Sequence, residues 1–313
     1  MKQKIFTFLL IAAAGLTACK KNEVYPDIKE YDNLQIENYL SANNLTGFTK
    51  AANDTTGIYY KIINPGTGTA LGYPDVVSIV YTMKSFDGKY VASDTIANHY
   101  VNALGHLTAG SATATTVPPL PRGLQLAIHD ILKYKGGSMH LMIPSRLAYG
   151  KSGFTINSAG NSKSLAGNQS LDFYVHVIDD QATYDDLSIR NYMKAKGLSG
   201  YTKTASGIWY KTITPGTGAA GSIKEFSNVT SSYNGTLLND AQFDTSTSFT
   251  GTPYGLVDGM KEILLNHAVE GSVLSIFIPS KLAYGQSESS GLVVIPSNSV
   301  LRFESTVTTV TQP

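Results

Sequence analysis

The chain has 313 residues, enough for about two ordinary domains, and 42% of them are hydrophobic, so a largely disordered protein is not expected. The formal net charge of +1 gives no electrostatic basis for binding nucleic acid or a strongly anionic surface. With 29 glycines and many Ser, Thr and Tyr residues, the composition favours β-structure with many turns over a helical bundle.

The first 18 residues have the pattern of a signal peptide. MKQK is basic, and IFTFLLIAAAGLTA is an apolar run too short for a comfortable membrane span. The tetrapeptide Leu16–Cys19 resembles the lipobox of bacterial lipoproteins, in which the chain is cut before the cysteine and the sulfur is lipidated. An ordinary secretory signal that ends near a cysteine is the alternative. Cys19 is the only cysteine, so lipidation would leave no thiol for disulfide or nucleophilic chemistry.

These features predict the location of the protein. We expect removal of residues 1–18, a lipid anchor on Cys19, and a polar linker over residues 19–31 that contains Pro26. The mature protein would be attached to the bacterial cell envelope, at the outer membrane, and would face either the periplasm or the outside. Nothing after Cys19 is long and apolar enough to span a bilayer.

The rest of the chain is an internal duplication. The octet IPSRLAYG, residues 143–150, returns as IPSKLAYG, residues 278–285, and differs only in Arg146 and Lys281. Residues 34–50 and 57–68 likewise match residues 187–203 and 207–218. The spacing is longer in the first copy, whose extra residues fall within 94–119 and read as a long irregular loop. We therefore predict two domains of one fold, residues 32–180 and 185–313.

Each copy shows the same order of predicted elements. A short amphipathic helix comes first, then an alternating strand that ends at a Pro-Gly turn, then further strands around one more helix. Asp32 is a possible N-cap of the first helix, with Ile36 and Leu40 on its apolar face; Ile189 and Met193 follow Asp185 and Asp186 in the second copy. The expected strands are 58–63, 76–83, 138–143, 171–178, 229–237, 273–278 and 300–310, and the later helices are 123–134 and 259–267. This pattern predicts an α+β fold in which an antiparallel sheet curls around one short helix.

The second copy resembles a known family. YNGTLLNDAQFDTS, GLVDGMKEIL, IPSKLAYG and VIPSNSVLRF occur in this order and are similar to the sequence elements of the FKBP-type peptidyl-prolyl cis-trans isomerase domain. The resemblance covers residues from about Ser206 to the end of the chain. It implies two FKBP-like domains, each an antiparallel half-barrel around one short helix, with a proline-binding pocket, isomerase (rotamase) activity and no cofactor.

The resemblance also implies the site residues. Tyr284 would donate a hydrogen bond to a substrate carbonyl, Asp244 would polarise the surroundings of the twisting amide, and the other residues would form apolar walls. Met260 stands where the family usually has Trp, so we expect weaker binding and a lower rate. Trp209, the only Trp, lies elsewhere and is no substitute. The pocket residues carried over are Tyr233, Phe243, Asp244, Val257, Met260, Tyr284, Ile295 and Phe303.

The first copy departs further from the family pattern. Its Phe-Asp pair aligns with Val91-Ala92, and a longer polar loop, residues 156–170, replaces the Ile-Pro-Pro element. We expect its pocket to be degenerate. The residues compared are Tyr81, Tyr149 and Phe173, which are retained, and Leu124 and Pro121, which replace the floor and a wall.

Two functions of different classes remain open. The first is a lipid-anchored peptidyl-prolyl isomerase that assists folding of exported proteins, acts mainly through the second domain, and binds proline-containing polypeptide segments. The second is a non-catalytic binding or chaperone module of the FKBP fold on a lipid anchor, because one fold hosts several functions; a purely structural lipoprotein subunit is a third. The six histidines are scattered and show no metal-ligand spacing.

Overall fold

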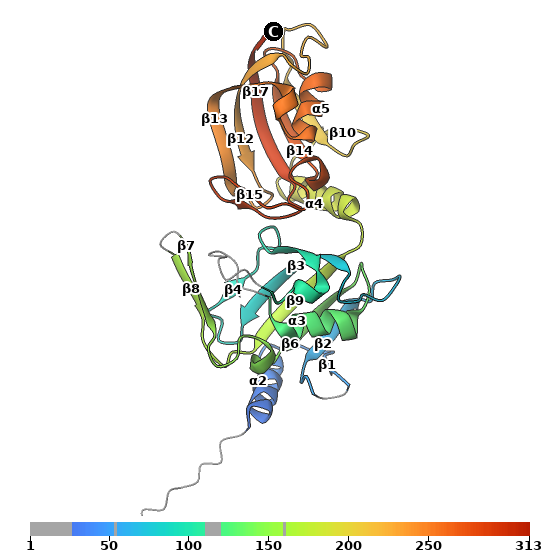
Figure 1. Cartoon of the computed structure of the whole chain (residues 1–313), viewed down its shortest axis with the longest axis vertical. Helices are drawn as coiled ribbons and strands as arrows, with labels where there is room; N and C mark the ends of the chain where they lie inside the picture. The colour runs from blue at the N-terminus through green and yellow to red at the C-terminus, as the bar shows by residue number, and fades with distance from the viewer. Residues whose placement is uncertain (1–26, 53–54, 110–119, 159–160) are drawn as a thin grey trace, which may run out of the picture.

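The structure is a computed structural model that describes residues 27–52, 55–109, 120–158 and 161–313. The predicted signal peptide, Cys19 and residues 19–26 of the predicted linker lie outside the described residues. Figure 1 shows two halves along the long axis, each with one large sheet, and helix α4 (Gln181–Ala195) at their junction. We refer to residues 27–180 as the first half and to residues 181–313 as the second half.

The two sheets have the same strand order. The first runs β1-β2-β6-β9-β3-β4, with β5 also paired to β3, and the second runs β10-β11-β14-β17-β12-β13. All of these pairs are antiparallel. The predicted fold class, α+β with an antiparallel sheet and few helices in each half, is confirmed.

The elements of the first half begin with helix α2 and end with strand β9. The four strands predicted here lie within two residues of observed strands, and the other five strands described in this half are not predicted from the sequence. The bounds are α2 Ile28–Ala42, β1 Thr49–Lys50, β2 Tyr59–Asn64, β3 Val76–Ser85, β4 Val91–Ala92, β5 His99–Ala103, the 3₁₀ helix η1 Leu104–His106, α3 Arg122–Leu126, the π-helix η2 Ala127–Leu132, β6 Ser138–Ile143, the 3₁₀ helix η3 Ser145–Leu147, β7 Phe154–Ser158, β8 Asn161–Leu165 and β9 Leu171–Ile178.

The second half repeats this order from helix α4. It has one continuous α-helix, α5, in place of α3 and η2. The remaining bounds are β10 Thr202–Lys203, β11 Trp209–Thr214, β12 Asn228–Thr236, β13 Gln242–Gly251, the 3₁₀ helix η4 Pro253–Gly255, α5 Asp258–His267, β14 Val273–Ile278, the 3₁₀ helix η5 Ser280–Leu282, β15 Ser289–Ser290, β16 Val294–Ile295 and β17 Leu301–Thr311.

Two predicted loops are wrong in part. Residues 99–103 of the supposed long loop form β5, which pairs with β3, and η1 follows; residues 110–119 lie outside the described residues. The supposed polar loop 156–170 contains most of the antiparallel hairpin β7–β8. Hairpins built from Ser, Asn and Lys are not predicted from the hydrophobic pattern of the sequence, because their strands lack the apolar alternation of a half-buried sheet.

The predicted helix caps are also wrong. Asp27 and Asp180 are the N-caps of α2 and α4, and each accepts a hydrogen bond from a backbone amide in the first turn. Helix α2 therefore begins at Ile28, inside the segment that we expected to be linker. Asp32 and Asp185 lie one turn inside their helices, where they are 1% and 2% exposed.

The two buried aspartates have another partner, the turn that begins the repeated octet. The carboxylate of Asp185 accepts hydrogen bonds from the backbone amide and the hydroxyl of Ser280, at 2.8 and 2.7 Å. In the first half, Asp32 accepts a longer bond of 3.3 Å from the amide of Arg146 and pairs with its guanidinium at 3.6 Å. In each half, this bond attaches the first helix to the turn that carries AYG.

Each later helix packs closely on its sheet. A Cβ atom on Gly259 would lie 2.3 Å from Cγ2 of Ile278, and one on Gly123 would lie 2.4 Å from Cγ2 of Ile143. Only glycine permits this approach, so both helices start in contact with the first residue of the octet, which is also the last residue of β6 or β14. Met260 follows Gly259 in α5, so the close packing of Gly259 also fixes the position of Met260.

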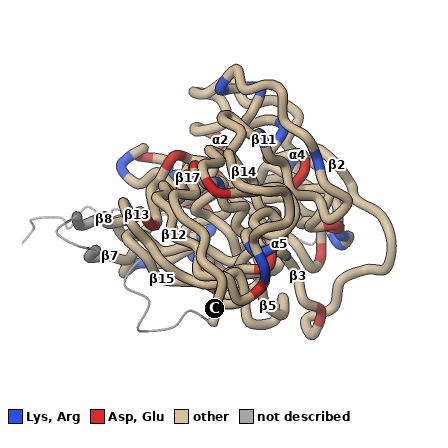
Figure 2. The backbone as a smooth tube through the Cα atoms, turned by 90° about the horizontal axis from the view of Figure 1, so that it is seen from above, with Lys and Arg blue, Asp and Glu red and all other residues tan. Residues whose placement is uncertain are grey.

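Within the described residues, no helix is both long and apolar enough to cross a membrane. Figure 2 shows basic and acidic residues interspersed along the backbone, in keeping with the net charge of +1.

We predict that Asp185→Ala lowers the free energy of unfolding of the second half by about 2–3 kcal/mol, because two donors of Ser280 lose their buried acceptor. The measurement is urea unfolding of the full chain followed by Trp209 fluorescence, which reports on the second half. Lys281→Ala, in the same turn but exposed, is the matched control and should stay within about 0.5 kcal/mol of wild type. Equal stability of the Asp185 and Lys281 variants would contradict this role for the carboxylate.

Candidate active site

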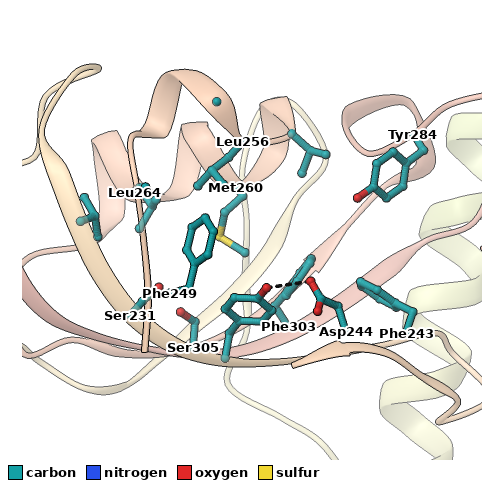
Figure 3. A pocket seen from close by; sticks show the side chains of 15 residues that line it. Ser231, Phe243, Asp244, Phe249, Leu256, Met260, Leu264, Tyr284, Phe303 and Ser305 are labelled. Carbon is teal, nitrogen blue, oxygen red and sulfur yellow. Dashed lines mark hydrogen bonds between the residues drawn. The ribbon is translucent and has the colours of Figure 1, made fainter. Parts of the chain in front are cut away.

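A cavity of ≈ 240 Å³ opens between α5 and the inner face of β12, β13 and β17 (Figure 3). It is smaller than the roughly 300–1,000 Å³ of typical small-molecule sites, and its walls are mainly apolar. Its residues come from strands, from the start of α5 and from the AYG turn. They are Val229, Ser231, Tyr233, Phe243, Asp244, Phe249, Gly251, Gly255, Leu256, Val257, Met260, Leu264, Tyr284, Phe303 and Ser305.

The structure brings seven of the eight predicted residues to this cavity; Ile295 is the eighth. Ile295 is 2% exposed and belongs to the hydrophobic cluster that also contains Phe243 and Met260, so it packs behind the wall. Val257 directly precedes α5, and its carbonyl accepts the amides of Met260 and Lys261.

Tyr233 and Asp244 form the polar pair of the site. The Tyr233 hydroxyl donates to Oδ2 of Asp244 at 2.7 Å, and the amide of Thr245 donates to Oδ1 at 2.8 Å (Figure 3). Burial, and next the hydrogen bond to Asp244, raise the pKa of Tyr233 to about 12. Tyr233 therefore stays protonated at neutral pH and holds the carboxylate in one orientation at the cavity.

Tyr284 lies across the cavity from this pair, with its hydroxyl directed inward (Figure 3). It is 41% exposed, so a ligand can reach it. Its turn is held at the next residue: the amide of Gly285 donates to Ser280 O at 2.9 Å, and Gly285 O accepts from the amide of Asn298 at 2.7 Å. Gly285 has φ of 59°, a conformation that favours glycine.

Aromatic rings form the walls beside the polar pair. Phe303 packs edge-on against Phe243 at 5.5 Å between centroids and against Tyr233 at 6.0 Å. A Cβ on Gly235 would lie 2.7 Å from the Phe243 ring, so the glycine lets this ring approach β12 closely. These contacts leave little freedom to the rings, which gives the cavity a defined shape.

Met260 forms the floor, and sequence reasoning missed the ring beside it. Phe249 lines the cavity next to Met260 in Figure 3 and packs edge-on against Tyr233 at 5.9 Å. The pairing of β12 with β13 shifts by one residue between Ser231 and Tyr233, so Phe249 lies opposite Ser231. Phe249 supplies an aromatic face near the position where Met260 lacks one. The only signal in the sequence is a lone aromatic in a run of Ser and Thr.

The corresponding region of the first half is filled by its own side chains. Phe154, from β7, packs edge-on against Tyr149 at 4.5 Å and against Tyr90 at 5.1 Å. Tyr81, Leu124 and Phe173 are at most 2% exposed. Burial raises the pKa of both Tyr81 and Tyr149. The degenerate pocket predicted here is thus a packed core in the structure.

The site carries no nucleophile–base pair beside the cavity. Among the described residues, no group of three or more His, Cys, Asp or Glu could hold a metal ion. What the cavity offers is an apolar, partly enclosed space with the Tyr284 hydroxyl and the Asp244 carboxylate facing each other. It can bind a small apolar ring and contact the polar amide next to it.

Comparison with known proteins shows what this site is similar to. Residues 220–308, which contain every residue that lines the cavity, match the family model "FKBP-type peptidyl-prolyl cis-trans isomerase". The FKBP-type peptidyl-prolyl cis-trans isomerase FkpA of Buchnera aphidicola subsp. Acyrthosiphon pisum (strain APS) is 34% identical over 125 residues, 38% of this chain and 47% of that protein. The outer membrane protein MIP of Legionella longbeachae is 31% identical over 134 residues, 41% of this chain and 54% of that protein.

The crystal structure of FkpA from Escherichia coli is similar over 42% of this chain and 61% of that one, with 28% identity and a TM-score of 0.36. The chain spans about half the length of the two curated relatives named above. Residues 220–308 of this chain are thus similar to the FKBP-type peptidyl-prolyl cis-trans isomerase family.

Proposed function

We propose that this protein is a peptidyl-prolyl cis-trans isomerase that acts through the cavity of its second half on proline-containing segments of polypeptides. The observation that carries the proposal is the apolar cavity with the Tyr284 hydroxyl on one side and the Asp244 carboxylate on the other. The similarity of residues 220–308 to the isomerase family supports it.

The reaction needs no covalent chemistry. Rotation about a peptide bond has a barrier of roughly 18–20 kcal/mol, because the planar amide is stabilised by resonance. Uncatalysed X-Pro exchange therefore takes tens to hundreds of seconds. An enzyme accelerates it by binding the twisted amide more tightly than either planar form.

The cavity can make this distinction. Apolar walls around Met260 and Phe249 hold the proline ring and keep water away from the amide, which weakens the hydration that favours the polar planar form. Tyr284 donates to a carbonyl of the substrate, and Asp244, held by Tyr233, provides a fixed charge beside the twisting bond. The donors and charges are in place before the substrate arrives, so they stabilise the twisted amide without reorganisation.

We place this activity in the cell envelope. The lipobox-like segment that ends at Cys19 supports a lipid anchor, and the name of the Legionella longbeachae relative, an outer membrane protein, supports the compartment. In that location the substrates would be exported proteins that fold at the membrane. The first half, with its filled pocket, would be a second FKBP-like domain that keeps the fold and does not bind proline.

A binding module without turnover is the second candidate. Met260 at the floor favours it, because a flexible thioether offers no flat rigid face to the proline ring. A peptide isomerisation assay decides between the two: catalysis supports the enzyme, whereas a proline peptide that raises the melting temperature without turnover supports the binding module.

We predict that Tyr284→Phe lowers kcat/KM for a proline peptide by about tenfold, which corresponds to the loss of one hydrogen bond of roughly 1.4 kcal/mol. Asp244→Asn should also lower kcat/KM, because the fixed charge beside the amide is lost. The assay follows isomerisation in the full chain, with melting temperatures as a check on folding. Tyr149→Phe, the same change in the octet of the first half, is the matched control and should leave the rate unchanged. Full activity in both site variants would refute the assignment of the site.

Phe249 gives a further prediction. Phe249→Ala should lower kcat/KM by about tenfold, because it removes the aromatic face beside Met260 and admits water to the cavity. Met260→Leu conserves the volume of the floor and should change kcat/KM less than about twofold. The same isomerisation assay measures both. A larger loss in the Met260 variant than in the Phe249 variant would mean that the thioether itself holds the ring.

A further inference from the structure

The first half contacts the second half at a segment next to the active site. We call residues 296–300, which join β16 to β17, the closing loop. Asn298 and Ser299 in this loop are each only 5% exposed. Ile96, from the first half, packs against the hydrophobic cluster of the second half, and Asp94 accepts a hydrogen bond from Asn239. The two halves are therefore in contact by apolar and polar side chains.

Two strands of the first half hold the closing loop directly. The amide of the Asn298 side chain donates to Ser78 Oγ, on β3, at 3.0 Å. His99, on the neighbouring strand β5, lies with Nδ1 2.9 Å from the carbonyl oxygen of Ser297. A carbonyl only accepts, so Nδ1 carries the proton. Burial lowers the pKa of His99, which keeps the imidazole neutral in this contact.

The closing loop is bonded in turn to the turn of Tyr284. The backbone amide of Asn298 donates to the carbonyl of Gly285 at 2.7 Å, one residue after Tyr284. One side chain of the loop therefore reaches the first half while the backbone of the same residue holds the active-site turn.

A second route connects the same places. The Asn298 side chain also donates to Oε1 of Gln181 at 2.9 Å, and Gln181 donates to Asp185 at 2.8 Å. Asp185 accepts both donors of Ser280, where the turn begins. Both ends of the turn that presents Tyr284 are thus linked by hydrogen bonds to Ser78 of the first half.

The first half provides an internal comparison. Asn168 has φ of 55° against 56° in Asn298, and its amide donates to Gly150 O at 2.8 Å, so the backbone arrangement is the same. Its side chain, however, is exposed. Ile28 occupies the first helical position that Gln181 has in the second half. The polar links to a neighbouring half therefore belong to the copy that has the open cavity.

We propose that the first half is a positioning scaffold for the active site of the second half, and that Asn298 and His99 are positioning residues which fix the Tyr284 turn through the closing loop. This proposal rests on the proposed isomerase function. In this role the first half must be folded and in contact with the second half. It does not need a proline pocket.

The test uses four variants of the full chain. Asn298→Gly keeps the left-handed backbone conformation and removes both side-chain bonds, while Ser78 and Gln181 keep their own bond at 3.0 Å. Asn168→Gly is the same change at the matched, exposed position. His99→Leu removes the donor to Ser297, and His99→Asn keeps a side-chain amide donor at a similar distance from the backbone.

We expect Asn298→Gly and His99→Leu to lower kcat/KM by about fivefold, the loss expected when a transition-state donor is less well placed. Asn168→Gly and His99→Asn should retain the wild-type value. Wild-type activity in Asn298→Gly and His99→Leu would overturn the proposal. An equal loss in all four variants would also overturn it, because it would reflect general destabilisation.

Hydrogen exchange measured by mass spectrometry provides a readout that does not depend on activity. The peptides that cover residues 280–299 should exchange faster in Asn298→Gly and His99→Leu than in the wild type and the two control variants. Unchanged exchange would overturn the scaffold. If the wild type shows no isomerase activity, the proposed function fails, and the exchange rates still decide whether the first half holds the Tyr284 turn.

Discussion

The hydrogen bonds of the buried Asp185 carboxylate are the interactions on which the second half depends. They attach α4 to Ser280, so the helix that opens the second half is joined to the turn that presents Tyr284. A buried charge is tolerated only when its oxygens are hydrogen-bonded, and here Gln181 and both donors of Ser280 supply these bonds. Burial nevertheless raises the pKa of Asp185, so the carboxylate retains part of its desolvation cost. The carboxylate joins α4 to the Ser280 turn, and through Gln181 it is linked to Ser78 of the first half.

The first half has a weaker form of the bond between Asp185 and Ser280, and this shared contact accounts for the octet in both halves. Asp32 reaches the octet of the first half through Arg146, and one of its carboxylate oxygens has no hydrogen-bond partner among the described residues. The octet thus marks the fold in both halves. Whether its tyrosine faces a ligand depends on other residues: Phe154 fills the space beside Tyr149, whereas the cavity beside Tyr284 stays open.

The sequence alone predicted the apolar strands, such as residues 138–143 and 273–278, which are buried along almost their whole length. It placed the helix caps wrongly, since Asp32 and Asp185 look like caps locally and serve a tertiary contact. It also missed Phe249. Strict alternation from Asp244 would turn Ser248 toward the cavity, and only the shift in pairing with β12 brings Phe249 there instead. Contacts between distant segments, such as His99 with Ser297, leave no pattern in one sequence.

The isomerase proposed here uses no nucleophile and would depend on geometry alone, which gives the duplication of the chain a particular use. Tyr284 lies in a turn that is partly exposed, and an exposed turn on its own would sample many positions. Hydrogen bonds from Asn298 and Ser280 restrict it, and both lead to groups in contact with the first half. In the first half Phe154 packs against Tyr149, and other residues of this half contact the closing loop. His99 and Ser78 lie on paired strands, a rigid element, and rigid elements hold a neighbouring turn better than a loop can.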